Sequence, residues 1–198
     1  MIKAVFFDVG GVLIKDNTRL MLRRQSRSLG VPYNNLRLRM KGDRLLLTKG
    51  TITRREYLGR LRKRFGLQRV TFAHLRFVFP KHYTLITTPW RIARRLRKNG
   101  YRVGIITNAT RPPSFAPRLR LTPLFWPIIR SYQVGAAKPE REIYEISRRR
   151  ARVKFQEMIF FDDRQKNVIA AKRLGIKAFV YKNPTQLVRS LRHLGVKI

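Results

Sequence analysis

The sequence contains no cysteine and few acidic residues. Because it has no thiols, disulfide bonds, thiolate metal sites and cysteine nucleophiles are all excluded. Only 10 of the 198 residues are Asp or Glu, against 46 Lys and Arg, which gives a formal net charge of +36. Each acid therefore stands out against a strongly cationic background, and its position is informative.

Long apolar runs are also lacking. Residues 1–8 form too short an apolar run for a signal peptide and end in an acid. No later run reaches the length of a membrane-spanning segment. We therefore expect a cytoplasmic protein that does not insert into membranes, while its oligomeric state stays open. Because 43% of the residues are hydrophobic and 11% are aromatic, we expect a folded core despite the charge.

Five short runs rich in Val, Ile, Phe and Tyr predict β-strands. They are residues 3–9, 101–107, 128–134, 157–162 and 176–181. Most are apolar at successive positions, which is typical of parallel strands buried on both faces. Between them, residues 89–99 and 168–174 have helical periodicity and are followed by Gly100 and Gly175, as helix ends often are. This alternation predicts an α/β fold, a Rossmann-like parallel sheet flanked by helices.

Residues 15–88 differ from the rest because they show helical periodicity but no convincing strand. A capping box over residues 53–56 (Thr-Arg-Arg-Glu) marks the start of one helix. We therefore expect a helical cap at 15–88, inserted after the first strand. Residues 1–14 and 89–198 would then form the Rossmann-like core.

Three of the few acids follow predicted strands. Asp8 comes after the apolar residues 4–7, and Asp162 and Asp163 come after residues 158–161. Open α/β sheets build their sites at the carboxyl ends of strands. A single Asp there is more often a helix cap or a turn residue. Three carboxylates at two strand ends favour a hard cation such as Mg²⁺, because they repel one another unless a cation lies between them.

Two further positions are candidates for binding an anion. Thr107 and Asn108 end the strand at 101–107 and could bind phosphate oxygens, although capping of the next turn explains Thr107 equally well. Lys138 precedes Pro139, which suits the first turn of a helix whose positive end Glu140 complements. A lysine just before such an end is unexpected unless an anion or carboxylates hold it.

Taken in order, these positions resemble the four motifs of the haloacid dehalogenase-like hydrolase superfamily. The motifs are residues 7–13 (Phe-Asp-Val-Gly-Gly-Val-Leu), 107–108 (Thr-Asn), 138–139 (Lys-Pro) and 161–167 (Phe-Asp-Asp-Arg-Gln-Lys-Asn). The resemblance covers nearly the whole chain. It looks closest to the branch that contains the sugar-phosphate phosphatases and the phosphatase domain of soluble epoxide hydrolases, whose helical cap follows the first motif.

The resemblance implies a Mg²⁺-dependent phosphatase that hydrolyses a small phosphate monoester. Asp8 would attack phosphorus and form an aspartyl-phosphate. Thr107, together with Asn108, would bind the phosphoryl oxygens. Lys138 would neutralise charge on Asp8 and on the phosphate, and Asn167 would orient that lysine.

The same resemblance implies the metal ligands. Asp8, Asp163 and the carbonyl of Gly10 would hold Mg²⁺, and Asp162 would assist directly or through water. Gly10 is also a departure, because most phosphatases of the superfamily carry an Asp there that protonates the leaving oxygen. Loss of such a group costs about 10²–10⁴ in rate when the leaving group is poor. We therefore expect a preference for good leaving groups, or an acid supplied by the cap or the substrate.

Two other functions are compatible with the sequence. A 2-haloacid dehalogenase of the same fold would use Asp8 to displace halide, but it needs no metal and would leave the Asp162-Asp163 pair unexplained. A catalytically weak scaffold that binds polyanions such as nucleic acid would use the charge, which engineered supercharging or a compositional bias could also explain. Its basic residues are spread over every segment, so such binding would be indifferent to nucleic-acid sequence.

The substrate is not identified by the sequence of the cap. His74, His82 and His193 lack the spacing of metal ligands, and we expect a structural role for each.

Overall fold

The computed structural model describes residues 1–71, 83–111, 121 and 123–198. Its centre is one five-stranded parallel sheet with the order β3-β2-β1-β4-β5. The strands are β1 (Ala4–Phe7), β2 (Arg102–Thr107), β3 (Ile128–Arg130), β4 (Met158–Asp162) and β5 (Lys177–Val180). In the central strand, Phe7 lies beside Ile105 of β2 and Phe161 of β4. The residues that follow these strands therefore emerge at one edge of the sheet.

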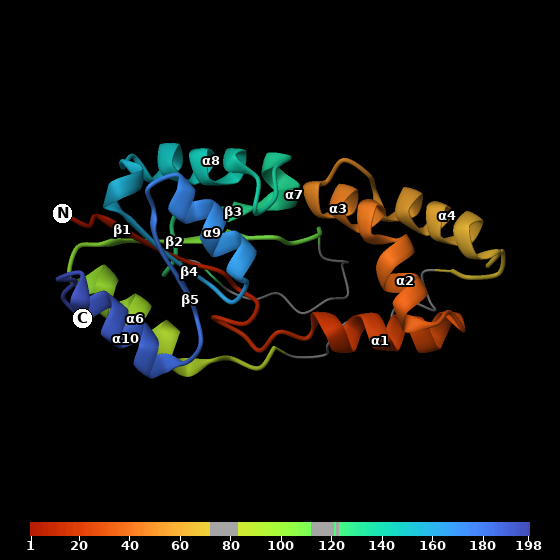
Figure 1. Cartoon of the computed structure of the whole chain (residues 1–198), viewed down its shortest axis with the longest axis horizontal. Helices are drawn as coiled ribbons and strands as arrows, with labels where there is room; N and C mark the ends of the chain where they lie inside the picture. The colour runs from red at the N-terminus through yellow and green to blue at the C-terminus, as the bar shows by residue number, and fades with distance from the viewer. Residues whose placement is uncertain (72–82, 112–120, 122) are drawn as a thin grey trace.

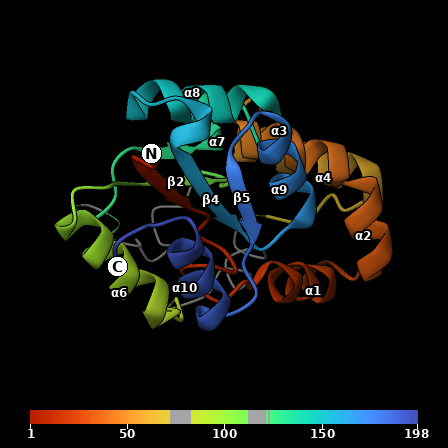
Figure 2. The ribbon, with the colours of Figure 1, turned by 60° about the vertical axis from the view of Figure 1, so that its left-hand side comes forward.

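Helices cover both faces of the sheet, as the sequence predicts (Figures 1 and 2). On one face lie α6 (Thr87–Lys98) and α10 (Pro184–His193), and on the other lie α8 (Arg141–Ala151) and α9 (Gln165–Arg173). Val5 and Phe7 of β1 pack into the first core cluster, and Ala4 and Phe6 pack into the second. Because successive side chains of a strand alternate between faces, a strand covered on both sides is apolar throughout.

Four helices follow β1 and extend beyond the carboxyl edge of the sheet (Figure 1). They are α1 (Thr18–Leu29), α2 (Tyr33–Arg39), α3 (Lys41–Lys49) and α4 (Arg54–Phe65). They enclose a separate apolar cluster that includes Leu36 and Leu61. The predicted capping box begins α4, because the Thr53 hydroxyl accepts from the Glu56 amide and the Glu56 carboxylate accepts from the Thr53 amide.

The chain leaves and re-enters the sheet region through two neighbouring segments. Ile14 and Leu85 form an antiparallel bridge, and the amide of Ile86 donates to the carbonyl of Leu13 at 2.9 Å. The separation of a cap at 15–88 from a core stays a proposal, and these paired segments would be its hinge. Residues 72–82 of that range, with His74 and His82, lie outside the described residues. None of the described helices has the length and apolar character needed to cross a membrane.

The predicted strand at 128–134 is too long. β3 ends at Arg130, and residues 131–134 form the short helix α7 (Ser131–Val134). Gly135 closes this helix in the left-handed conformation at φ 72°, with its amide donating to the Ser131 carbonyl. Over four residues the apolar pattern of a strand and that of one helical turn are the same, so the sequence alone does not distinguish them.

Two helix starts also differ from the sequence prediction. Helix α8 begins at Arg141 with Glu140 as its N-cap, so Pro139 lies before the helix instead of in its first turn. Helix α9 begins at Gln165, not at residue 168, which brings Asn167 into its first turn.

Candidate active site

The sheet brings the three predicted acids together. Asp8 directly follows β1, Asp162 is the last residue of the neighbouring β4, and Asp163 follows it. The Asp8 amide donates to the Phe161 carbonyl at 2.8 Å, which continues the pairing of the two strands. One carboxylate oxygen from each acid lies within 4.8 Å of the others. The parallel pairing of two buried strands, β1 and β4, is therefore sufficient to bring the three acids together.

Lys138 lies between two of these acids. Its ammonium group is 2.9 Å from Oδ1 of Asp8 and 2.5 Å from Oδ2 of Asp162. Only 2% of Lys138 is exposed, so its charge is compensated by these two carboxylates and not by water. Two carboxylates therefore hold Lys138 in place. They explain why a lysine lies just before the positive end of a helix.

Asp162 is saturated with protein partners. Its Oδ1 accepts from the amide of Arg164 at 2.8 Å and from Nδ2 of Asn167 at 2.9 Å. Its Oδ2 accepts from Lys138 and, at 3.1 Å, from the same Asn167 nitrogen. Asp162 is fully buried. Its geometry suits a residue that fixes Lys138, and Asn167 reaches Lys138 only through Asp162 among the described contacts.

Asn108 is bound to the backbone of Lys138. Its Nδ2 donates to the Lys138 carbonyl at 2.9 Å, and its Oδ1 accepts from the Lys138 amide at 2.8 Å. Thr107 is buried at the end of β2, one strand away from Asp8. The structure therefore places Thr107 at the predicted edge, while both polar atoms of the Asn108 side chain are used to hold the lysine.

Asp163 is the acid with free coordination capacity. Its Oδ1 is buried and has no hydrogen-bond partner among the described residues. Burial, with the neighbouring charges of Asp8 and Asp162, raises the pKa of Asp163 to about 6. Burial also raises the pKa of Asp8, against the lowering effect of Lys138. A cation would reverse both shifts, because it stabilises ionised carboxylates. The cluster could therefore hold a metal.

The loop after β1 is folded tightly against this cluster. Gly11 has φ 78°, and its amide donates to the Ile14 carbonyl at 2.8 Å. A Cβ atom on Gly11 would lie 2.7 Å from both Cγ and Oδ2 of Asp163. Position 11 thus requires glycine for its backbone conformation and for the approach to the acid.

Sequence reasoning missed three residues around the site. Ser131 is fully buried, and its hydroxyl joins the loop after Thr107, through Ala109, to the carbonyl of Thr48 in α3. The hydroxyl of Tyr144 donates to the Asn167 carbonyl at 2.9 Å. Asp16 lies in the connection to α1, where its negative charge acts on Asp163. Of these three, only Asp16 could have been singled out from the sequence, because it is one of only ten acidic residues.

Comparisons with known proteins agree with this architecture. A HAD family enzyme of Bacteroides thetaiotaomicron, solved with magnesium and inorganic phosphate, is 24% identical with a TM-score of 0.72, over 92% of this chain and 95% of its own. A predicted HAD-like hydrolase of Porphyromonas gingivalis is 23% identical with a TM-score of 0.76, over 100% of both chains. A 2-haloacid dehalogenase of Pseudomonas syringae is 20% identical with a TM-score of 0.68, over 98% and 100%.

These likenesses establish the fold alone, since each identity is below 25%. The family itself follows from the sequence, because residues 2–175 match the model of the haloacid dehalogenase-like hydrolases. That range contains every residue of the acid and lysine cluster described above. The chain belongs to the haloacid dehalogenase-like hydrolases.

Proposed function

We propose that this hydrolase is a Mg²⁺-dependent phosphatase that cleaves small phosphate monoesters through an aspartyl-phosphate on Asp8. One observation carries the proposal: in a cluster of three acids, a buried oxygen of Asp163 has no hydrogen-bond partner among the described residues. A divalent cation would satisfy that oxygen and offset the repulsion within the cluster. The structure of the Bacteroides relative with magnesium and inorganic phosphate supports the same chemistry.

In this proposal Asp8 is the nucleophile. Its Oδ1 is held by the amide of Val9 at 2.7 Å and by Lys138, so the carboxylate is fixed in orientation. The Asp8 side chain is 11% exposed at the carboxyl edge of the sheet, which leaves it accessible to a substrate. Attack on phosphorus would break the bond to the leaving oxygen and give the aspartyl-phosphate, which water then hydrolyses.

Lys138 would stabilise the negative charge that develops on Asp8 and on the phosphoryl group. Asp162 and Asn108 hold its ammonium group and its backbone in place, and Asn167 in turn holds Asp162. Thr107 would contribute its hydroxyl to the phosphoryl oxygens. Such preorganised charge is the main contribution a protein makes to phosphoryl transfer.

Asp8, Asp163 and the Gly10 carbonyl are the proposed metal ligands, with Asp162 as an indirect support. When bound, Mg²⁺ supplies charge that stabilises the phosphoryl group being transferred. The dehalogenase reaction is the weaker alternative, because it gives no reason for burying an Asp163 oxygen that has no partner within the described part of the chain.

Hydrolysis of p-nitrophenyl phosphate with and without Mg²⁺ tests the proposal, with Asp8→Asn as the matched variant. We expect metal-dependent release of p-nitrophenol by the wild type and a loss of at least about 10³-fold in the variant. A parallel assay of halide release from 2-chloropropionate without metal tests the alternative. Equal phosphatase rates for wild type and variant would overturn the proposed nucleophile.

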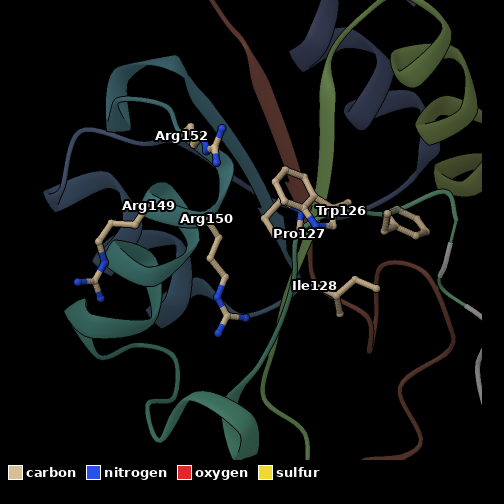
Figure 3. A pocket seen from close by; sticks show the side chains of 7 residues that line it. Trp126, Pro127, Ile128, Arg149, Arg150 and Arg152 are labelled. Atoms are coloured by element: carbon tan, nitrogen blue, oxygen red, sulfur yellow. The ribbon is translucent and has the colours of Figure 1, made fainter.

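A second, non-catalytic function is favoured by the charge. We propose that the surface binds polyanions such as nucleic acid without sequence preference. One concave region at the amino ends of β2 and β3 is an example of this basic surface, because Arg149, Arg150 and Arg152 line one side of it and Trp126 lines the other (Figure 3). Binding that weakens steeply with added salt would support this role, and a sequence preference that survives high salt would contradict it.

A further inference from the structure

Gly10 has room for a side chain, and that room lies next to the carboxylate of Asp16. A Cβ atom built on Gly10 has a single heavy atom within 4 Å outside its chain neighbours, which is Oδ1 of Asp16 at 4.0 Å. Gly10 is not among the residues with positive φ, so its backbone would accept a side chain. The position at which most phosphatases of the superfamily carry an acid is therefore vacant here, and an acid from another position lies beside it.

Asp16 is held at the boundary between the sheet and the helices that follow β1. Its Oδ1 accepts from the amide of Thr18 at 2.8 Å and from its hydroxyl at 2.6 Å. Its Oδ2 lies 3.7 Å from Nη2 of Arg164, the residue after Asp163. The Asp16 side chain is 34% exposed, so it is fixed in position and still accessible to a substrate. The negative charge of Asp16 helps to raise the pKa of Asp163, as expected of a near neighbour.

Among the described residues, Asp16 is the only acid with a side-chain atom within 4 Å of a Cβ atom on Gly10. All ten acids lie in the described residues, and three of them form the cluster at the sheet edge. Six others are engaged elsewhere, in a capping box or in ion pairs: Asp43, Glu56, Glu140, Glu142, Glu145 and Glu157. Asp16 also has an ion-pair partner, Arg164, but it is the acid that lies beside Gly10.

We propose that Asp16 is the proton-transfer residue that replaces the missing acid at position 10, an inference that rests on the proposed phosphatase function. When Asp8 attacks phosphorus and the bond to the leaving oxygen breaks, protonated Asp16 gives its proton to that oxygen and an alcohol departs. Water then attacks the aspartyl-phosphate and the bond to Asp8 breaks. The Asp16 carboxylate takes the proton of that water, so inorganic phosphate is released and both residues return to their starting state.

The test compares Asp16→Asn with the wild type on an aryl and an alkyl phosphate. The amide keeps an oxygen that can accept from Thr18, so the fold around it is preserved. On the alkyl substrate β-glycerophosphate we expect kcat/KM to fall by about 10²–10⁴, because a poor leaving group needs the proton. On p-nitrophenyl phosphate the first turnover should stay within about tenfold of the wild-type rate, since that leaving group needs no acid. Later turnovers should be slow, which gives a burst of one p-nitrophenolate per site.

Two further variants make the result specific. Gly10→Asp in the Asp16→Asn background should restore alkyl phosphatase activity, because the new carboxylate occupies the space beside position 16. Glu142→Gln, which removes the same charge from an exposed pair with Arg149, should leave both activities unchanged.

The outcomes separate this proposal from the function on which it rests. If Asp8→Asn hydrolyses p-nitrophenyl phosphate as fast as the wild type, the phosphatase function fails and Asp16 has no reaction to serve. If Asp8→Asn is inactive but Asp16→Asn hydrolyses both substrates at the wild-type rate, only the role of Asp16 is overturned. An equal loss on both substrates in the first turnover, without rescue by Gly10→Asp, would overturn it as well, since it would indicate a structural role.

Discussion

The carboxyl and amino edges of the sheet differ in the burial of their charged side chains. At the carboxyl edge, Asp8, Asp162 and Lys138 are buried, and each of the two carboxylates is paired with the lysine. At the amino edge, Trp126 is 55% exposed in an open cavity of about 460 Å³ that is lined by three arginines (Figure 3). A buried charge depends on its particular partners, whereas exposed charges act through their sum. Specific chemistry is therefore expected at the first edge and general attraction of anions at the second.

The largest effect is expected from Lys138→Met, which removes the buried cation and keeps most of the side-chain length. Two buried carboxylates then lose their partner, so we expect the free energy of unfolding to fall by about 3–5 kcal/mol and phosphatase activity to be lost. Urea denaturation with EDTA present measures the stability. The matched control is Lys49→Met, which breaks a partly exposed pair with Glu140 and should cost about 1 kcal/mol or less. Equal costs at both sites would remove the distinction between the two kinds of charge.

Gly11→Ala is the next largest perturbation of the carboxyl edge. The added Cβ atom would lie 2.7 Å from the Asp163 carboxylate, in a backbone conformation that costs a non-glycine residue about 1–2 kcal/mol. Gly30→Ala is the control, because Gly30 has a similar φ of 64° and open space around it. Both variants should lose a similar amount of stability through backbone strain, but only Gly11→Ala should weaken Mg²⁺ binding, by about tenfold or more in calorimetric titration. Equal Mg²⁺ affinities would show that Gly11 serves the turn alone.

The acid cluster was predictable from the sequence because each of its parts has a local signal. Asp8 and the Asp162-Asp163 pair each end an apolar run, and neighbouring parallel strands bring such ends together. The core strands and the capping box at Thr53 were predictable for the same reason, since each pattern spans only a few residues.

The support of the cluster was not predictable, because it depends on contacts between distant parts of the chain. Asn108 holds the backbone of Lys138, 30 residues away, and Ser131 bonds to Thr48, 83 residues away. The first contact gives Asn108 a part in positioning Lys138, while its predicted binding of phosphate stays a prediction, and the second accompanies the turn of α7 that replaces a predicted strand. The cytoplasmic location and the extent of the cap stay predictions.

The ionisation of Asp163 gives a smaller, pH-dependent effect. Because burial raises its pKa to about 6 in the folded protein, the folded state binds more protons than the unfolded state between about pH 4 and pH 6. The stability of the metal-free protein should therefore fall as pH rises through this range, by about 1–2 kcal/mol once solvent screening is allowed for. The variant Asp163→Asn should lack this part of the pH dependence of stability. Saturating Mg²⁺ should reverse its sign in the wild type. Urea unfolding at pH 4.5 and pH 6.5 measures the difference between wild type and variant, and parallel curves would contradict the shift.

The smallest effect is expected at the amino edge. Arg150→Gln removes one of many exposed charges, so binding to duplex DNA should weaken by about 1 kcal/mol or less, with a salt slope lower by about 1 if that arginine contacts a phosphate. Arg24→Gln, on the exposed surface of α1, should weaken binding equally, because the attraction comes from the total charge of +36. Fluorescence anisotropy over a range of salt concentrations compares the two variants. A loss several times larger for Arg150 would mean that the cavity beside Trp126 is a dedicated binding site, and the contrast between a specific edge and a general one would no longer hold.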